Sequence, residues 1–176
     1  MELPCFLDCE ASSLSRESYP IEIAWSMCDG SIESYLINVE HYPADYIDWE
    51  IGAERVHGLS REYLEKTGKH PLIVAKKLCV ALGGKRVITS APEFDGFWVK
   101  RLFDAVGLKC DIDFGHIENV LDDLIPEQLK NDQVYVSKLY KTARKECGLP
   151  PHRASHDVAF LIKLYQIAYD KSKALK

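Results

Sequence analysis

Apolar and polar residues follow two different periods along this chain. Continuous or alternating apolar runs are typical of β-strands, whereas apolar residues that recur every three or four positions are typical of helices. The first pattern predicts strands over residues 3–9, 21–27, 31–39, 86–90 and 112–117. The second predicts helices over residues 71–82, 94–106, 118–130, 134–147 and about 154–171. Three early strands, followed by strands that alternate with helices, predict an α/β fold: a five-stranded mixed sheet with helices on both faces.

Turn and cap residues mark the ends of several expected elements. Asp29-Gly30 is a hairpin signal between the second and third expected strands. The connection over 40–69 is long, polar and aromatic, and within it Gly58 is typical of a helix end and Ser60 of a helix N-cap. Because there is no internal repeat or linker, we expect a single domain over 1–176.

Composition narrows the classes of function. The net charge of −5 excludes an overall basic field, so any nucleic-acid binding must use local patches. No apolar run approaches the ~20 residues of a membrane span, and the opening residues 1–4 lack the pattern of a secretory signal. We therefore expect a cytoplasmic protein that has no membrane partner and whose six cysteines are reduced.

Two acids lie at the end of the first expected strand, in the run CFLDCE over 5–10. Side chains alternate along a strand, so Asp8 and Glu10 project to the same side. Two neighbouring carboxylates at the end of a buried strand repel each other and lose hydration. Protonation relieves this, and so does a divalent cation with a preference for hard oxygen ligands. A strand that simply ends in solvent is the alternative.

Three further residues are candidates for the same chemistry. Asp95 lies in the first turn of its expected helix on the same face as Val99, so it is either a ligand or a favourable charge at the helix N-terminus. Asp157 lies near the start of the last expected helix, and it too is either a ligand or a favourable charge at the helix N-terminus. His152 precedes that helix, behind two prolines that favour an extended entry. Its position near an acid makes it a candidate general base, although a solvated loop histidine is the simpler reading.

Two other patterns indicate different sites. Cys5 and Cys9, together with His152 and His156, suggest zinc, but residues four apart on a strand lie ~13 Å apart and cannot both reach one ion. The basic residues in the stretch 138–145 indicate either a phosphate-binding helix face or a solvated helix surface. The sequence does not decide between these two interpretations of the stretch 138–145.

Taken in order, the candidate residues resemble a known family. Asp8-x-Glu10-Ala11-Ser12, Phe94-Asp95-x2-Trp98 and His152-Arg153-Ala154-x2-Asp157 are similar to the three motifs of the DEDDh 3′–5′ exonucleases, and VHGLS over 56–60 is similar to a segment common between the first two motifs. The group includes proofreading exonucleases, ribonuclease T and oligoribonuclease. The resemblance extends over about residues 4–168, with departures at Ser13, where many members have Gly, and at Ala91, where many have Asn.

The resemblance implies a ribonuclease-H-like fold and a two-metal site. Two Mg²⁺ or Mn²⁺ ions would lie about 3.5–4 Å apart. Asp8 would bridge them, Glu10 and Asp157 would complete the site of the ion that carries the attacking water, and Asp95 would hold the second ion through water. His152 would take the proton from that water.

The same resemblance implies contacts for the substrate, a single-stranded DNA or RNA that is cut from its 3′ end to nucleoside 5′-monophosphates. The terminal nucleotide would rest on the segment Ala11, Ser12, Ser13 and Leu14, with His57 as a further contact. The alternatives are a catalytically silent member that only binds single strands and a metal-binding scaffold of unrelated purpose. The sequence does not choose between DNA and RNA or between a monomer and a homodimer.

Overall fold

The computed structural model describes residues 2–174 and contains the predicted five-stranded mixed sheet. The strands are β1 (Cys5–Ala11), β2 (Pro20–Ser26), β3 (Ile32–Leu36), β4 (Arg86–Thr89) and β5 (Asp113–His116). Their order across the sheet is β3-β2-β1-β4-β5. The first three strands form an antiparallel meander, and β4 and β5 continue the sheet parallel to β1. β1 therefore lies at the centre, where both of its faces are covered.

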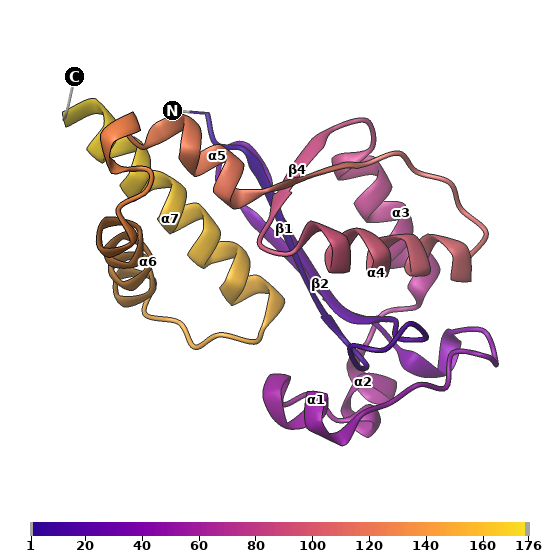
Figure 1. Ribbon diagram of the computed structural model, residues 1–176. Helices are drawn as coiled ribbons and strands as arrows, with labels where there is room; N and C mark the ends of the chain where they lie inside the picture. The colour runs from indigo at the N-terminus through magenta and orange to yellow at the C-terminus, as the bar shows by residue number, and fades with distance from the viewer. Residues whose placement is uncertain (1, 175–176) are drawn as a thin grey trace.

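Helices cover both faces of this sheet, as Figure 1 shows. They are α1 (Ile51–His57), α2 (Arg61–Thr67), α3 (Pro71–Leu82), α4 (Pro92–Ala105), α5 (Ile117–Leu124), α6 (Gln133–Cys147) and α7 (Ala154–Ala174). α3 and α4 pack on one face, and α5, α6 and α7 lie on the other. The short helices α1 and α2 lie beyond the end of β1, where Glu50 N–H donates to the carbonyl of Ser12. The predicted α/β class is confirmed.

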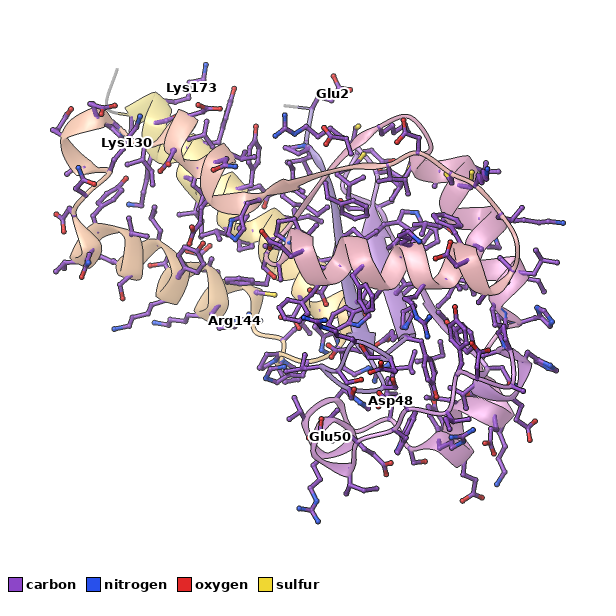
Figure 2. All side chains as sticks on the ribbon, turned by 45° about the vertical axis from the view of Figure 1, so that its right-hand side comes forward. Glu2, Asp48, Glu50, Lys130, Arg144 and Lys173 are labelled. Carbon is purple, nitrogen blue, oxygen red and sulfur yellow. The ribbon has the colours of Figure 1, made fainter. Side chains whose placement is uncertain are left out.

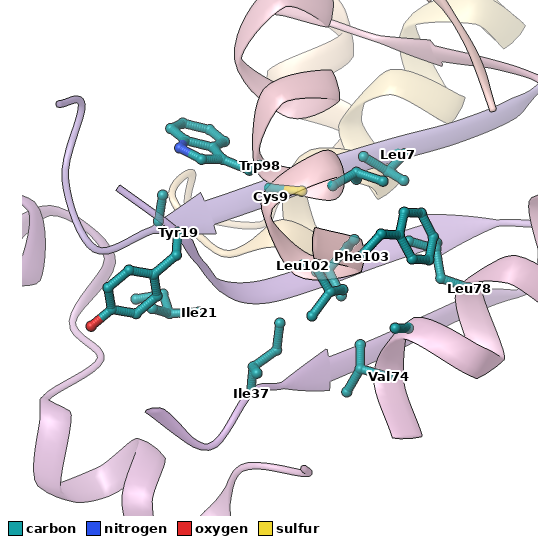
Figure 3. Close-up of a cluster of buried hydrophobic side chains, with 14 of the residues drawn as sticks. Leu7, Cys9, Tyr19, Ile21, Ile37, Val74, Leu78, Trp98, Leu102 and Phe103 are labelled. Atoms are coloured by element: carbon teal, nitrogen blue, oxygen red, sulfur yellow. The ribbon is translucent and has the colours of Figure 1, made fainter. Parts of the chain in front are cut away.

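Alternation along β1 divides its side chains between two hydrophobic cores. Leu7 and Cys9 are buried beneath α3 and α4, in the cluster of Figure 3. Phe6 is buried in the second cluster, with residues of α5, α6 and α7. Asp8 and Glu10 have the parity of Phe6, so they point to the α7 face near the carboxyl end of the strand. The fold thereby brings the two acids towards α7.

Local sequence accounts for where most elements end. Gly58 has a φ of 71° after α1, and Ser60 Oγ accepts from Tyr63 N–H at the start of α2, as the sequence predicts. The helix expected over 118–130 ends at Leu124, and only a short 3₁₀ turn over Glu127–Leu129 follows. Pro126 explains this difference, because its ring and missing N–H interrupt a helix and favour an extended residue before it.

The β2–β3 hairpin is present, with its tight turn over Met27–Gly30 closed by a hydrogen bond from Gly30 N–H to the carbonyl of Met27. Gly30 has a φ of 87°, a conformation that glycine adopts without strain. Within residues 2–174, no helix combines the length and apolar character needed to cross a membrane.

Candidate active site

Three carboxylates meet where β1 passes the start of α7. One oxygen from each of Asp8, Glu10 and Asp157 lies within 4.8 Å of the corresponding oxygens of the other two. Asp8 and Glu10 come from alternate positions of β1, and Asp157 from the first turn of α7. The contact of α7 with β1 thus brings together acids that are about 150 positions apart in the sequence.

Burial and crowding raise the pKa values of Asp8 and Glu10. Burial, followed by the charges of Asp95 and Asp157, raises the pKa of Asp8 well above its usual value. Burial is also the main cause that raises the pKa of Glu10 to about 8, and Asp157 contributes next. Without metal, Glu10 is therefore mostly protonated at neutral pH, and a bound cation would displace that proton.

Asp95 lies beside this cluster but reaches it from the other side of the sheet. It is 2% exposed in the first turn of α4. Its Oδ1 accepts from Cys9 N–H at 3.1 Å, and its Oδ2 accepts from the Thr89 hydroxyl. β1 and β4 pair only at Cys5 and Phe6, so past that point the strands leave room for this carboxylate.

The environment of Asp95 has opposing effects on its charge. Burial raises its pKa to about 7 against the hydrogen bonds from Thr89 and Cys9, which lower it. Both oxygens of Asp95 accept bonds from the protein, so this carboxylate is held in place. That arrangement is compatible with a contact to an ion through water.

His152 lies in the loop that enters α7. Its backbone N–H donates to Asp157 Oδ2 at 2.7 Å, and its side chain is exposed. Its φ is 66°, and within residues 2–174 it is the one non-glycine residue with a positive φ. Such a conformation is rare for residues with a Cβ and has to be held by surrounding contacts. His156 instead lies within α7, and its Nδ1 is 3.0 Å from the carbonyl oxygen of Pro150.

An ion pair between the half-buried Arg153 and the buried Glu22 holds this loop against the sheet, and it was not predicted from the sequence. Arg153 Nε and Nη2 donate to the two carboxylate oxygens of Glu22 on β2, at 2.9 and 2.8 Å. Ala154 N–H also donates to Glu22, whose side chain is 2% exposed. Glu22 pairs with Glu10 across β1 and β2. One signal was available in the sequence: Glu22 is an acid inside the apolar run of β2, a strand that is buried along its whole length.

The segment after β1 is anchored by its hydroxyls. Ser12 and Ser13 are both buried, and each donates to Asp48 Oδ2. Leu14 is 72% exposed and lines a hollow of about 240 Å³ with Phe94 and neighbouring residues of α4. The predicted substrate segment is therefore a rigid turn that presents an apolar side chain to solvent.

His57 is buried at the end of α1. Its Nδ1 accepts from Leu59 N–H at 3.0 Å, so Nε2 carries the proton of the neutral ring, and this atom has no partner among the described residues. Burial is the main cause that lowers the pKa of His57, and the charges of Arg153 and His152 act in the same direction. His57 thus has an unused donor, which is buried.

The donor set fits a hard divalent cation. Three carboxylates converge, two of them with raised pKa values, and oxygen ligands are those that Mg²⁺ and Mn²⁺ prefer. The zinc alternative does not fit, because Cys5 and Cys9 are buried in the core beneath α3 and α4, on the opposite face of β1 from Asp8. All six cysteines are free.

Comparison with known proteins gives a structural likeness alone. No family model matches the chain, and no curated protein matches it. The zinc-bound complex of E. coli exonuclease I with single-stranded DNA superposes with a TM-score of 0.66 at 16% identity, over 97% of this chain and 42% of that one. The complex with a dA16 oligonucleotide gives 0.64 at 16% identity, over 96% and 43%. The product-bound form gives 0.64 at 14% identity, over 97% and 44%.

This chain thus spans about two fifths of the length of the exonuclease I chains it matches. Identity at this level establishes the fold and no more. The β3-β2-β1-β4-β5 sheet with helices on both faces is accordingly the ribonuclease-H-like fold that exonuclease I also has.

Proposed function

We propose that this protein is a metal-dependent exonuclease that removes nucleotides from the 3′ end of single-stranded DNA or RNA. The observation that carries the proposal is the convergence of Asp8, Glu10 and Asp157 at one end of β1, with Asp95 and His152 beside them. The order of these residues along the chain is the order of the DEDDh motifs. The likeness to exonuclease I bound to oligonucleotides supports the same class of substrate.

Four acids would hold two Mg²⁺ or Mn²⁺ ions. Asp8 would contact both, Glu10 and Asp157 would hold one, and Asp95 would hold the other through water. When bound, such ions supply activation of water and stabilisation of the charge that develops on a cleaved phosphodiester. The carboxylates in turn fix where the phosphodiester lies relative to β1.

His152 would accept the proton released when water attacks the phosphodiester. Its exposed side chain leaves the ring free for this role, and its backbone is held by Asp157. The Arg153–Glu22 pair fixes the adjacent residue to β2. The loop therefore carries the base at a defined position relative to the carboxylates.

The terminal nucleotide would rest on the turn Ala11–Leu14. Leu14 and Phe94 offer apolar surface for a base, and stacking on such surface tolerates any sequence. The Nε2–H of His57 has no partner among the described residues but is buried, so its donation to that nucleotide would require neighbouring side chains to move. These contacts would select a free strand end, and hydrolysis of its last phosphodiester would release a nucleoside 5′-monophosphate.

Incubation of 5′-labelled single-stranded DNA and RNA of equal sequence, with Mg²⁺ or Mn²⁺, tests the proposal. We expect a ladder that shortens from the 3′ end and is absent with EDTA or with Asp8→Ala. A strand that is bound but stays intact under all of these conditions would instead identify a silent single-strand-binding protein. The same gel compares DNA with RNA.

A further inference from the structure

The basic stretch of α6 lies beside the carboxylates. Arg144 Nη1 donates to Asp157 Oδ1 at 3.1 Å, and its guanidinium lies over the Phe160 ring, 3.7 Å from the centroid. Figure 2 marks Arg144 on the part of α6 that precedes the loop to α7. Lys141 and Lys138 precede it at intervals of three residues, each about 4.5 Å along the helix axis. The stretch is therefore a row that starts at the site.

Two hollows follow this row. The first, of about 460 Å³, is lined by Asp8, Asp157, Arg144 and Lys141, with Tyr140 and Phe160 as aromatic walls. The second, of about 490 Å³, is lined by Lys141 and Lys138 with Gln133, Val134 and Ser137 near the start of α6. Lys141 belongs to both. A concave path thus runs from the carboxylates along α6.

The two lysines of this row, unlike Arg144, pair with no acid among residues 2–174. Lys66, Lys100 and Lys130 each pair with an acid three or four residues away. Within residues 2–174, by contrast, Lys138 and Lys141 have no carboxylate oxygen within 4.0 Å of their ammonium groups. Arg144 uses one of its five N–H groups on Asp157, and a guanidinium matches the geometry of a phosphate.

We propose that Arg144, Lys141 and Lys138 form a phosphate track for the part of the strand on the 5′ side of the cleaved bond. This inference rests on the proposed function. The terminal nucleotide occupies the turn after β1, towards α4, whereas the track leaves the carboxylates on the α6 side. In a protein of net charge −5 with a cluster of acids at its centre, such a row offsets the repulsion of a polyanion.

Binding measurements on unreacted strands test the track. All proteins carry Asp8→Ala to prevent cleavage, and anisotropy of labelled dT12 is followed with Mg²⁺ over a range of salt concentrations. Because Arg144 also touches Asp157, the test variant is Lys138→Gln/Lys141→Gln. The control, Lys76→Gln/Lys109→Gln, removes the same charge from exposed residues that lie outside α6 and line neither hollow.

The track variant should bind dT12 roughly tenfold more weakly than the control at low salt, with a salt slope smaller by about 1.4, since each contact to a single strand contributes ~0.7. Equal affinities and equal salt slopes in the two variants would overturn the track. If the wild-type protein still degrades oligonucleotides in that case, the proposed function stands without the track. If wild-type protein neither binds nor degrades any strand, the proposed function fails, and the track fails with it.

Discussion

Replacement of Arg153 by Met should destabilise the fold far more than loss of a surface charge. The change keeps much of the side-chain volume but removes two of the donors to Glu22, whose side chain is 2% exposed. The donors that remain are Ala154 N–H at 3.1 Å and the Ser34 hydroxyl at 3.4 Å. Loss of one partner from a buried pair costs about 3–5 kcal/mol. Because the Arg153 side chain is 37% exposed and water can replace part of it, we expect the lower end of that range.

At 2–4 °C per kcal/mol for a protein of this size, the melting temperature should fall by roughly 6–12 °C. Chemical unfolding of Arg153→Met, followed by circular dichroism, measures the free energy directly. Arg61→Met is the matched control, since Arg61 pairs with Glu65 on the surface of α2 and should contribute under about 0.5 kcal/mol. Equal losses in the two variants would refute the reasoning that Arg153 holds a buried charge.

Three further predictions concern the acids and the histidines. Asp8→Ala should abolish nuclease activity. Without metal it should unfold at a higher temperature than wild type, because it removes repulsion from the neighbouring carboxylates. Activity near that of wild type would exclude Asp8 from the site. The folded pKa of Glu10, about 8, lies above its ordinary value of 4.5, so stability present at low pH is lost as pH rises through 8, and melting without metal should follow that fall. Millimolar Mg²⁺ or Mn²⁺ should reverse it, and an unchanged melting curve would contradict the cluster. His152→Ala should lower kcat by roughly 10²–10⁴-fold and His156→Ala much less; the reverse order would overturn the assignment of the base.

Much of the fold follows from local pattern. Each predicted strand is present, and Gly58 and Ser60 end and start helices as predicted. The apolar run of β2 matches its burial, whereas β3 is largely exposed and was also indicated by the hairpin turn before it. The helix expected over 118–130 is too long because its apolar spacing continues past Pro126, whereas the backbone cannot. The helix α1 within the long connection was indicated only by Gly58 at its end. Most of its side chains are exposed to solvent, so its sequence has no clear apolar period.

The site was predictable as a set of residues but not as a geometry. Alternation along β1 sufficed to place Asp8 and Glu10 together. Asp157 was a candidate from its position on the last helix, and the family resemblance implied that it joins them. The partner of Glu22 lies 131 positions away, and no local pattern reports which cation a buried acid contacts. The same limit left the basic stretch of α6 ambiguous until the contact of Arg144 with Asp157 placed it at the site.

We infer that the acids at the end of β1 hold two divalent ions. Anomalous diffraction from crystals grown with Mn²⁺ would locate both ions. We predict two peaks about 4 Å apart, one within ligand distance of Asp8, Glu10 and Asp157 and the other between Asp8 and Asp95. A crystal with millimolar Mn²⁺ in which Arg144 still occupies Asp157 and no peak lies beside Asp8 would contradict the claim.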